Sequence, residues 1–303
     1  MTPRAFGCLL AGLLALPACA GELAWQRAGE SLALQAGTGT VWAFHWDAAA
    51  TKPYFHPLAL PGGPPLTWLR PPDHRWHCGV WFSWKFINGV NYWEEDAKTG
   101  RPAGLTRWSN VVVEARPDFS ARIAMDLTYA PPGRPAVLTE RRVLELTPPA
   151  ADGSYTLDWQ ARFTAGTTSV ELAASPVNAA KTAGGYAGLI WRVSPELKEW
   201  HAVNEVGQRD LALHGEPARA VDFSGTFGTQ AVGVAMFDHP DNPGHPGPWF
   251  LRLDEVKRYG LHGPGLLFGG SRQLPAGADL PLRYRLVVHP GRLDAPTLRQ
   301  HRW

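Results

Sequence analysis

The sequence predicts an all-β fold, in the form of a large antiparallel β-sandwich. From about residue 110 onward, apolar and polar residues alternate, as they do in strands with one face in the core and one in water. The 32 Gly and 28 Pro are spread along the chain, which favours frequent turns over long helices. Strands that recur at regular spacing between such turns are typical of a sandwich or a barrel.

The N-terminal residues 1–20 are expected to form a cleaved secretion signal. One Arg precedes an apolar run at residues 5–16, and the small residues of Ala18–Ala20 follow it, which is the usual arrangement before a cleavage site. The apolar run is shorter than the roughly 20 residues that span a bilayer. The alternative is a lipid anchor at Cys19, a pattern that Pro17 fits poorly. The sequence therefore predicts an exported protein, periplasmic or extracellular, without an integral membrane segment after signal removal.

Residues 21–303 are expected to form a single all-β domain. The chain is 45% hydrophobic and 18% charged, which provides enough apolar material for a sizeable core. The net charge is only +2 and no run of basic residues occurs, so a nucleic-acid partner is not expected. Cys78 is the one cysteine outside the predicted signal, and no disulfide bond is therefore expected within the mature chain.

Eight segments are predicted to be strands, and two are predicted to be short helices. Alternation is clearest at Ala121–Tyr129, Ser154–Thr164 and Pro281–His289. Clusters of Pro, Gly and Asp separate neighbouring strands. Further strands are expected at Ala136–Thr147, Ser169–Ala174, Ala187–Val193, Ala231–Phe237 and Trp249–Leu253, and helical turns at Pro195–Trp200 and Asp294–His301.

Two irregular segments interrupt the strand pattern, at Lys52–Asp96 and Phe237–Gly270. The first is rich in Pro and His and carries five of the 14 Trp between residues 68 and 93. The second combines several His with a run of Pro and Gly. Irregular backbone that carries aromatic, imidazole and carboxylate groups on a rigid scaffold is typical of binding sites. Both segments are therefore predicted to contribute to a functional site.

Motifs in these two segments resemble the hallmarks of the DUF6807 family. They are Lys52–Pro57, Asp73–Phe82, Asn88–Trp93, Asp238–Pro243 and Arg258–Gly260. The resemblance implies a secreted bacterial β-sandwich protein of a kind often encoded beside genes for polysaccharide breakdown. The family also carries the label "methane oxygenase PmoA", which does not fit a chain without several membrane-spanning helices. The expected architecture is similar to the galactose-mutarotase-like supersandwich.

Four residues of the first irregular segment are candidates for catalysis: His74, His77, Asp73 and Glu94. An imidazole ordinarily titrates near neutral pH and can serve as general acid or base. A carboxylate can supply the complementary group, as in many sugar-cleaving enzymes. The alternative interpretation is that Asp73 only orients one buried histidine and that the pair holds the loop in place.

Ten further residues are candidates for substrate binding. Aromatic rings can stack against the C–H faces of sugars, and basic side chains can bind hydroxyls or a carboxylate of an acidic sugar. The alternatives are that the Trp rings belong to the core and that the basic side chains form surface ion pairs. The candidates are Lys52, Tyr54, Arg70, Trp81, Asn88, Trp93, His239, Asn242, Arg252 and Tyr259.

The leading functional hypothesis is a carbohydrate-active enzyme that uses a His/carboxylate pair on a small-molecule or oligosaccharide substrate. Hydrolysis, elimination and epimerisation all need such a pair, so the reaction type stays open. One alternative is a non-catalytic glycan-binding protein. Another is a metal-dependent oxidoreductase, although His-x-x-His alone is a weak metal signal and no metal site is predicted. No cofactor is expected, because the sequence has neither a dinucleotide fingerprint nor a P-loop.

Overall fold

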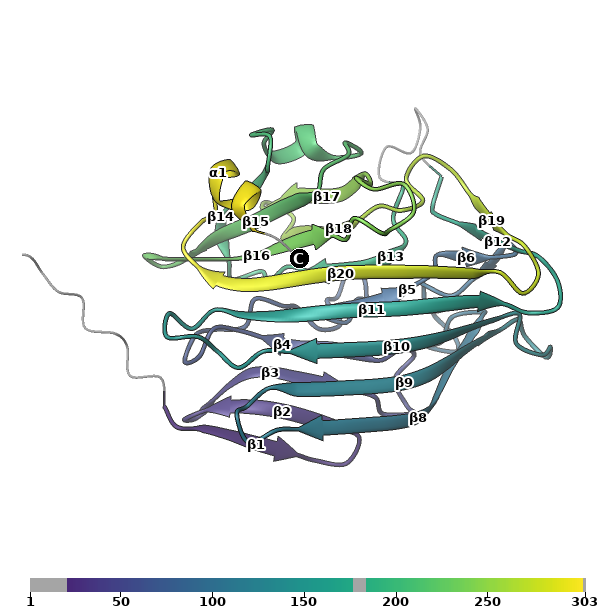
Figure 1. Cartoon of the computed structure of the whole chain (residues 1–303), viewed down its shortest axis with the longest axis horizontal. Coiled ribbons are helices and arrows are strands. Elements are labelled where there is room, and N and C mark those ends of the chain that lie inside the picture. The colour runs from purple at the N-terminus through teal and green to yellow at the C-terminus, as the bar shows by residue number, and fades with distance from the viewer. Residues whose placement is uncertain (1–20, 177–183, 302–303) are drawn as a thin grey trace, which may run out of the picture.

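Two eight-stranded sheets, each with antiparallel neighbours, make up most of the protein (Figure 1). The computed structural model describes residues 21–176 and 184–301. The predicted secretion signal at residues 1–20 lies outside this range. The prediction of an all-β protein built as a large antiparallel sandwich is confirmed. No helix among the described residues is long and apolar enough to cross a membrane.

The first sheet carries the candidate site described below. Its order is β1-β2-β3-β4-β5-β13-β18-β17. The strands are β1 (Leu23–Arg27), β2 (Ser31–Ala36), β3 (Gly39–His45), β4 (Tyr54–Leu58), β5 (Val80–Ser83), β13 (Gly188–Arg192), β18 (Tyr259–Pro264) and β17 (Trp249–Asp254).

The second sheet contains the long strands at the front of Figure 1, in the order β14-β15-β16-β20-β11-β10-β9-β8. They are β14 (Lys198–Asn204), β15 (Ala220–Phe227), β16 (Gln230–Asp238), β20 (Asp279–Pro290), β11 (Tyr155–Ala165), β10 (Leu138–Leu146), β9 (Ala121–Ala130) and β8 (Leu105–Ala115). A small third sheet joins β19 (Arg272–Leu274), β12 (Val170–Ala173), β6 (Phe86–Ile87) and β7 (Val90–Asn91). The helical elements are η1 (Asp210–Leu213) and α1 (Ala295–Gln300).

The main core lies between the two large sheets. Strand β11 shows the predicted alternation, with every second residue from Tyr155 to Ala165 buried. Its inward rings meet those of the first sheet, since Phe163 stacks on Phe82 of β5 at a centroid distance of 5.1 Å. This core also holds a fully buried ion pair, in which Nε and Nη2 of Arg142 donate to Glu140 at 2.6 and 2.9 Å.

The eight predicted strands all coincide with observed strands, but one predicted helix is wrong. The Asp294–His301 segment forms α1, capped by the Asp294 carboxylate, which accepts a hydrogen bond from the Thr297 N–H. The Pro195–Trp200 segment instead turns and enters strand β14. Two buried apolar side chains three residues apart, Leu197 and Trp200, imitate helical spacing there.

The two irregular segments contain more strand than the sequence suggested. Lys52–Asp96 supplies the short strands β4, β5, β6 and β7, and Phe237–Gly270 supplies β17 and β18. Strand β5 is buried at all four positions, so it shows no alternation of apolar and polar residues. A strand with both faces covered cannot be recognised by a period of two. The loops between these strands remain irregular, as predicted.

Candidate functional site

A second apolar cluster covers the outer side of the first sheet, opposite the main core. On β5, Val80 and Phe82 belong to the main core, whereas Trp81 between them points to the other side. The buried members of this cluster are Cys78, Trp81, Trp93, Ile190, Phe250 and Leu261, and its half-buried rim comprises Tyr54, Leu69, Trp76, Tyr186, Tyr259 and Phe268. We call these twelve residues the aromatic face.

The loop at residues 71–79 places two of the predicted histidines on the aromatic face. His77 stacks on Trp81 with ring centroids 5.0 Å apart, and His74 stacks on His77 at 4.7 Å. Tyr259 lies 5.0 Å from His74. The loop with the two histidines therefore contacts strand β18, which follows it by almost 200 residues in the sequence.

Gly79 lets this loop return to the sheet. Its φ is +68°, and a Cβ atom on it would lie 2.2 Å from the Phe55 carbonyl oxygen. Its N–H donates to the Trp68 carbonyl, and its own carbonyl accepts from the Arg192 N–H. Only glycine fits such a close approach of backbone to backbone.

Asp73 links His74 to a buried arginine. Its Oδ2 accepts hydrogen bonds from His74 Nδ1 at 3.0 Å and from Arg192 Nη2 at 2.9 Å. The Arg192 guanidinium is fully buried between the rings of Trp68 and Tyr259, at 5.1 and 4.4 Å from their centroids. Because an ionised carboxylate can only accept, Nδ1 of His74 is the donor of this hydrogen bond, and in the neutral imidazole Nε2 then carries the lone pair.

His77 lies below His74 in a different environment. It is only 2% exposed, and its Nδ1 finds no partner among the described residues. Burial lowers the pKa of His77 well below its usual value, and the neighbouring His74 adds to the shift. His77 is therefore a neutral ring in the floor of the face, whereas the His74 side chain is 32% exposed. Of the two predicted histidines, His74 is the one that a ligand can reach.

Glu94 is a charged carboxylate at the edge of the aromatic face. Its Oε1 accepts from the Tyr186 hydroxyl at 2.9 Å, and its Oε2 accepts from Asn91 Nδ2 and pairs with Lys85. Burial alone would raise the pKa of Glu94, but these partners outweigh it and lower the pKa below its usual value. The Tyr186 ring contacts Trp93 at 5.2 Å, which connects Glu94 to the face.

Lys52 and Arg70 fix the loops around the site. Lys52 is buried, and its Nζ donates to the main-chain carbonyls of Trp76 and Trp93 at 3.2 and 3.0 Å. Burial lowers the pKa of this ammonium group. Arg70 at the rim donates to both carboxylate oxygens of Glu95 at 3.0 and 2.8 Å. Both side chains thus tie the 52–78 region to the 93–95 segment.

The remaining binding candidates divide between the aromatic face and other places. Tyr54 is paired in register with Trp81. Arg252 lies over Phe250, with its guanidinium carbon 4.7 Å from the ring centroid and Nη1 2.9 Å from His214 Nε2. Both belong to the candidate site.

Asn88, His239 and Asn242 hold local structure elsewhere. Asn88 accepts from the Glu171 N–H in the third sheet. His239 accepts from the Asp241 N–H, and Asn242 donates to Asp238 at the end of β16. These described contacts involve no member of the aromatic face.

Comparison with known proteins identifies the family. A family model described as "Family of unknown function (DUF6807)" matches residues 31–302. The chain belongs to this family. A search of curated proteins gives no match. Among solved structures, the chain is similar to the "galactosidase domain of alpha-galactosidase-sucrose kinase, AgaSK", with 11% identity over 89% of its length and a TM-score of 0.40. The match covers 42% of that other chain.

Sequence reasoning missed three side chains that complete the site of this DUF6807 protein. Arg192 anchors Asp73, Tyr186 binds Glu94, and Lys85 pairs with Glu94. Arg192 carried a usable signal, because it is a charged residue within the otherwise apolar predicted strand Ala187–Val193. Tyr186 is separated from Glu94 by 92 positions, and no local pattern reports such a contact. Trp81 and Trp93, expected as a stacking wall, are 0% and 1% exposed.

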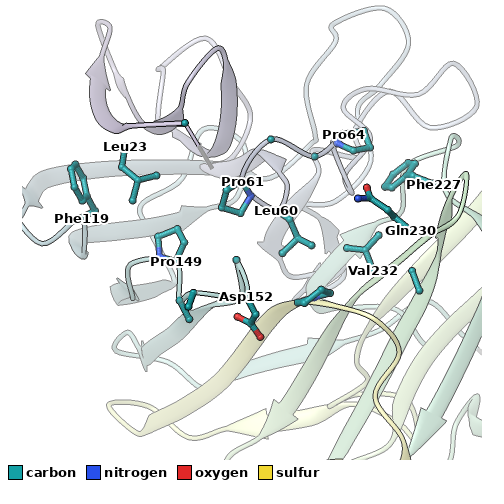
Figure 2. Close-up of a pocket in the computed structure, with 18 of the residues that line it drawn as sticks. Leu23, Leu60, Pro61, Pro64, Phe119, Pro149, Asp152, Phe227, Gln230 and Val232 are labelled. Carbon is teal, nitrogen blue, oxygen red and sulfur yellow. The ribbon is translucent and has the colours of Figure 1, made fainter. Parts of the chain in front are cut away.

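The DUF6807 chain also has a cleft of about 900 Å³ at one end of the sandwich (Figure 2). No predicted site residue lines it. Among the described residues its titratable lining groups are the carboxylates of Glu22 and Asp152, and Asp152 is engaged by the N–H and hydroxyl of Ser154. Other lining residues are Leu23, Leu60, Pro61, Pro64, Phe119, Pro149, Phe227, Gln230 and Val232. The cleft offers a mainly apolar surface without a histidine.

No metal centre is built by the described side chains. Within residues 21–176 and 184–301, no group of three or more His, Cys, Asp or Glu is arranged to hold a metal ion. His74 and His77 lie ring on ring and not side by side around a common point. The described side chains on and around the aromatic face offer imidazole, carboxylate and aromatic groups.

Proposed function

We propose that this DUF6807 protein is an exported carbohydrate-active enzyme whose active site is the aromatic face. The observation that carries the proposal is the Asp73–His74 pair, which Arg192 anchors among aromatic rings. An imidazole oriented by a carboxylate, with its second nitrogen free, is a common arrangement for a general base. The exposed side of His74 and the half-buried rings beside it define where a sugar binds.

In this proposal, His74 moves the proton and Asp73 stabilises the charge that results. Nε2 of neutral His74 accepts a proton from the substrate, and the Asp73 carboxylate stabilises the imidazolium through Nδ1. The imidazolium can then return the proton to a leaving group on the same side of the sugar. In epimerisation the opposite face takes its proton from water, and the imidazolium releases its own proton to solvent. Glu94 remains ionised and serves as an acceptor for sugar hydroxyls. Elimination and epimerisation share this first step, whereas in hydrolysis the same nitrogen accepts the proton of the attacking water.

The rim rings supply the binding surface. Trp76, Tyr186 and Tyr259 are half-buried, so each has ring area that a ligand can contact. Sugar C–H groups pack against aromatic faces. The buried Trp81 and Trp93 support these rings from below. This arrangement replaces the stacking wall expected from the sequence.

The experiment is to incubate residues 21–303 with a panel of plant and algal oligosaccharides and to follow the sugars by proton NMR. We expect new or exchanging signals from the wild type, and a loss of roughly 10²- to 10⁴-fold in rate for His74→Ala, the range that general acid–base groups contribute. His201→Ala is the matched control, because His201 is exposed on β14 of the other sheet. Full activity of the His74→Ala protein would contradict the assignment.

The same experiment separates the enzyme from a non-catalytic glycan-binding protein. The half-buried rings of the aromatic face are the observation that favours the binding alternative, because stacking needs no proton transfer. Line broadening without new signals, together with weaker broadening for Tyr259→Ala, would move the assignment to glycan binding.

A further inference from the structure

Two arginines occupy one row across three neighbouring strands of the first sheet. Arg192 of β13 and Arg252 of β17 are both paired in register with Leu261 of β18, which lies between them. Residues directly opposite each other on antiparallel strands point to the same side of the sheet. Strands lie about 4.8 Å apart, so the two arginine backbones are roughly 10 Å apart. Leu261 belongs to the aromatic face, and both arginines therefore belong to its side of the sheet.

The buried Arg192 of this row keeps N–H groups that no described residue satisfies. Asp73 engages only Nη2 of Arg192, while Nε and Nη1 find no partner among the described residues. Glu94 is paired with Lys85 and Glu95 with Arg70.

Arg252 is the half-buried member of the row and is held in place before any ligand arrives. Its guanidinium lies over the Phe250 ring, and Nη1 contacts His214 Nε2 and the Leu251 carbonyl, each at 2.9 Å. A guanidinium fixed in this way loses little conformational freedom on binding. Its planar set of N–H donors matches the two oxygens of a carboxylate.

We infer that the sugar bound at the aromatic face carries a carboxylate, so that the substrate class is a uronate-containing glycan. This inference rests on the proposed function and deepens it. Arg252 binds the carboxylate directly, and the buried Arg192 adds its positive charge from beneath Tyr259. The sugar ring then lies between the two arginines, over Leu261 and beside Tyr259. This position is within reach of the part of the face that carries His74 and His77.

The test compares oligosaccharides that differ only in charge. Trimers of galacturonate, mannuronate and glucuronate are titrated into the full mature chain beside their methyl esters, and affinity is measured by NMR line broadening or calorimetry. We expect at least one acid to bind about 10-fold tighter than its ester, the loss typical of one charge-assisted hydrogen bond. Arg252→Gln should lower the affinity for the acid about 10-fold and leave that for the ester unchanged.

Arg162→Gln is the matched control, because the exposed Arg162 of β11 pairs with Asp279 on the other sheet. Its affinity for the acid should equal that of the wild type. Equal binding of every acid and its ester, or no binding of any acid, overturns the inference. A sulfated trimer of neutral sugars, which carries charge but no carboxylate, also overturns it if it binds as tightly as the acid, because the site would then recognise charge and not a carboxylate.

The outcomes distinguish this inference from the proposed function. If neutral sugars are converted in a His74-dependent manner while the acids show no advantage, the proposed function stands and the uronate inference falls. If the acids bind in an Arg252-dependent manner but no sugar is converted, the uronate inference stands and the enzymatic proposal falls.

Discussion

At the scale of single residues, burial separates two histidines that the sequence presents as equals. His74 and His77 occur three positions apart and stack on each other. His74 has a carboxylate partner on one nitrogen and a side chain that is 32% exposed, whereas His77 is enclosed between His74 and Trp81. A buried imidazole with a depressed pKa stays neutral and fills space. The same residue type thus serves two purposes at adjacent positions of one motif.

Replacement of His77 by alanine should therefore act on stability. The variant removes a ring that is stacked on both sides, and we expect a loss of about 2–4 kcal/mol in the free energy of unfolding, as for other large-to-small changes in a core. Urea unfolding measures this loss, with His74→Ala as the comparison, because its partly exposed ring should cost less than about 1 kcal/mol. A fully stable His77→Ala protein without activity would instead assign the catalytic role to His77.

Much of the residue content of the site could be predicted from one motif, and the rest could not. Asp73, His74 and His77 lie in one short loop, so their proximity follows from the chain itself. Arg192 is separated from Asp73 by 119 positions, and only the pairing of β13 with β5 brings it there. Alternation of apolar residues identifies strands but not which strands are neighbours. Contacts of that kind depend on strand order.

At the scale of elements, the alternation of apolar and polar residues follows solvent exposure. Strands β9, β10 and β11 keep one wet face and show clear alternation. Strands β5 and β13 are buried on both sides, between the main core and the aromatic face. Strand β13 is nevertheless among the predicted strands, whereas β5 is not. Alternation alone therefore does not identify the strands that carry the site.

The loop that carries His74 depends on the backbone freedom of Gly79. We expect Gly79→Ala to lower stability by more than about 3 kcal/mol or to displace the loop, since a Cβ would meet the Phe55 carbonyl at 2.2 Å. Gly89→Ala is a matched control, because Gly89 also has positive φ but has open space around its Cβ position. That control should cost about 1 kcal/mol.

Thermal unfolding and the NMR assay together check this prediction. Gly79→Ala should lose sugar conversion in parallel with the melting temperature, whereas Gly89→Ala should keep it. Equal behaviour of the two variants would show that the return of the loop at Gly79 does not position His74.

At the scale of the whole molecule, the site needs the complete sandwich. The loop at 71–79, strand β13 and the β17–β18 hairpin come from three distant parts of the chain, and they meet only when the first sheet is assembled. That sheet is in turn supported by the second sheet through rings such as Phe82 and Phe163. Loss of either sheet therefore removes the site, and the global stability of the fold sets the conditions under which the site exists.

That global stability should fall as the solution becomes acidic, because several histidines are buried in a neutral state. Burial lowers the pKa of His262 to about 3 and that of His56 to about 4, and it lowers that of His77 as well. In the unfolded chain each imidazole takes up a proton below about pH 6.5, whereas the folded chain excludes it. The unfolded state then binds more protons, so the free energy of unfolding decreases by up to about 1.4 kcal/mol per pH unit for each histidine.

Urea unfolding at several pH values between 5.0 and 6.5 tests this expectation, because carboxylates contribute little in that window. The decisive variant is His262→Phe, which keeps a ring stacked on Trp249, where the centroid of the imidazole now lies 5.2 Å away. The free energy of unfolding of this variant should fall less steeply with decreasing pH than that of the wild type. The difference in slope should be about the contribution of one histidine. An unchanged slope would mean that His262 gains a proton in the folded protein, and that the core beside β18 admits water.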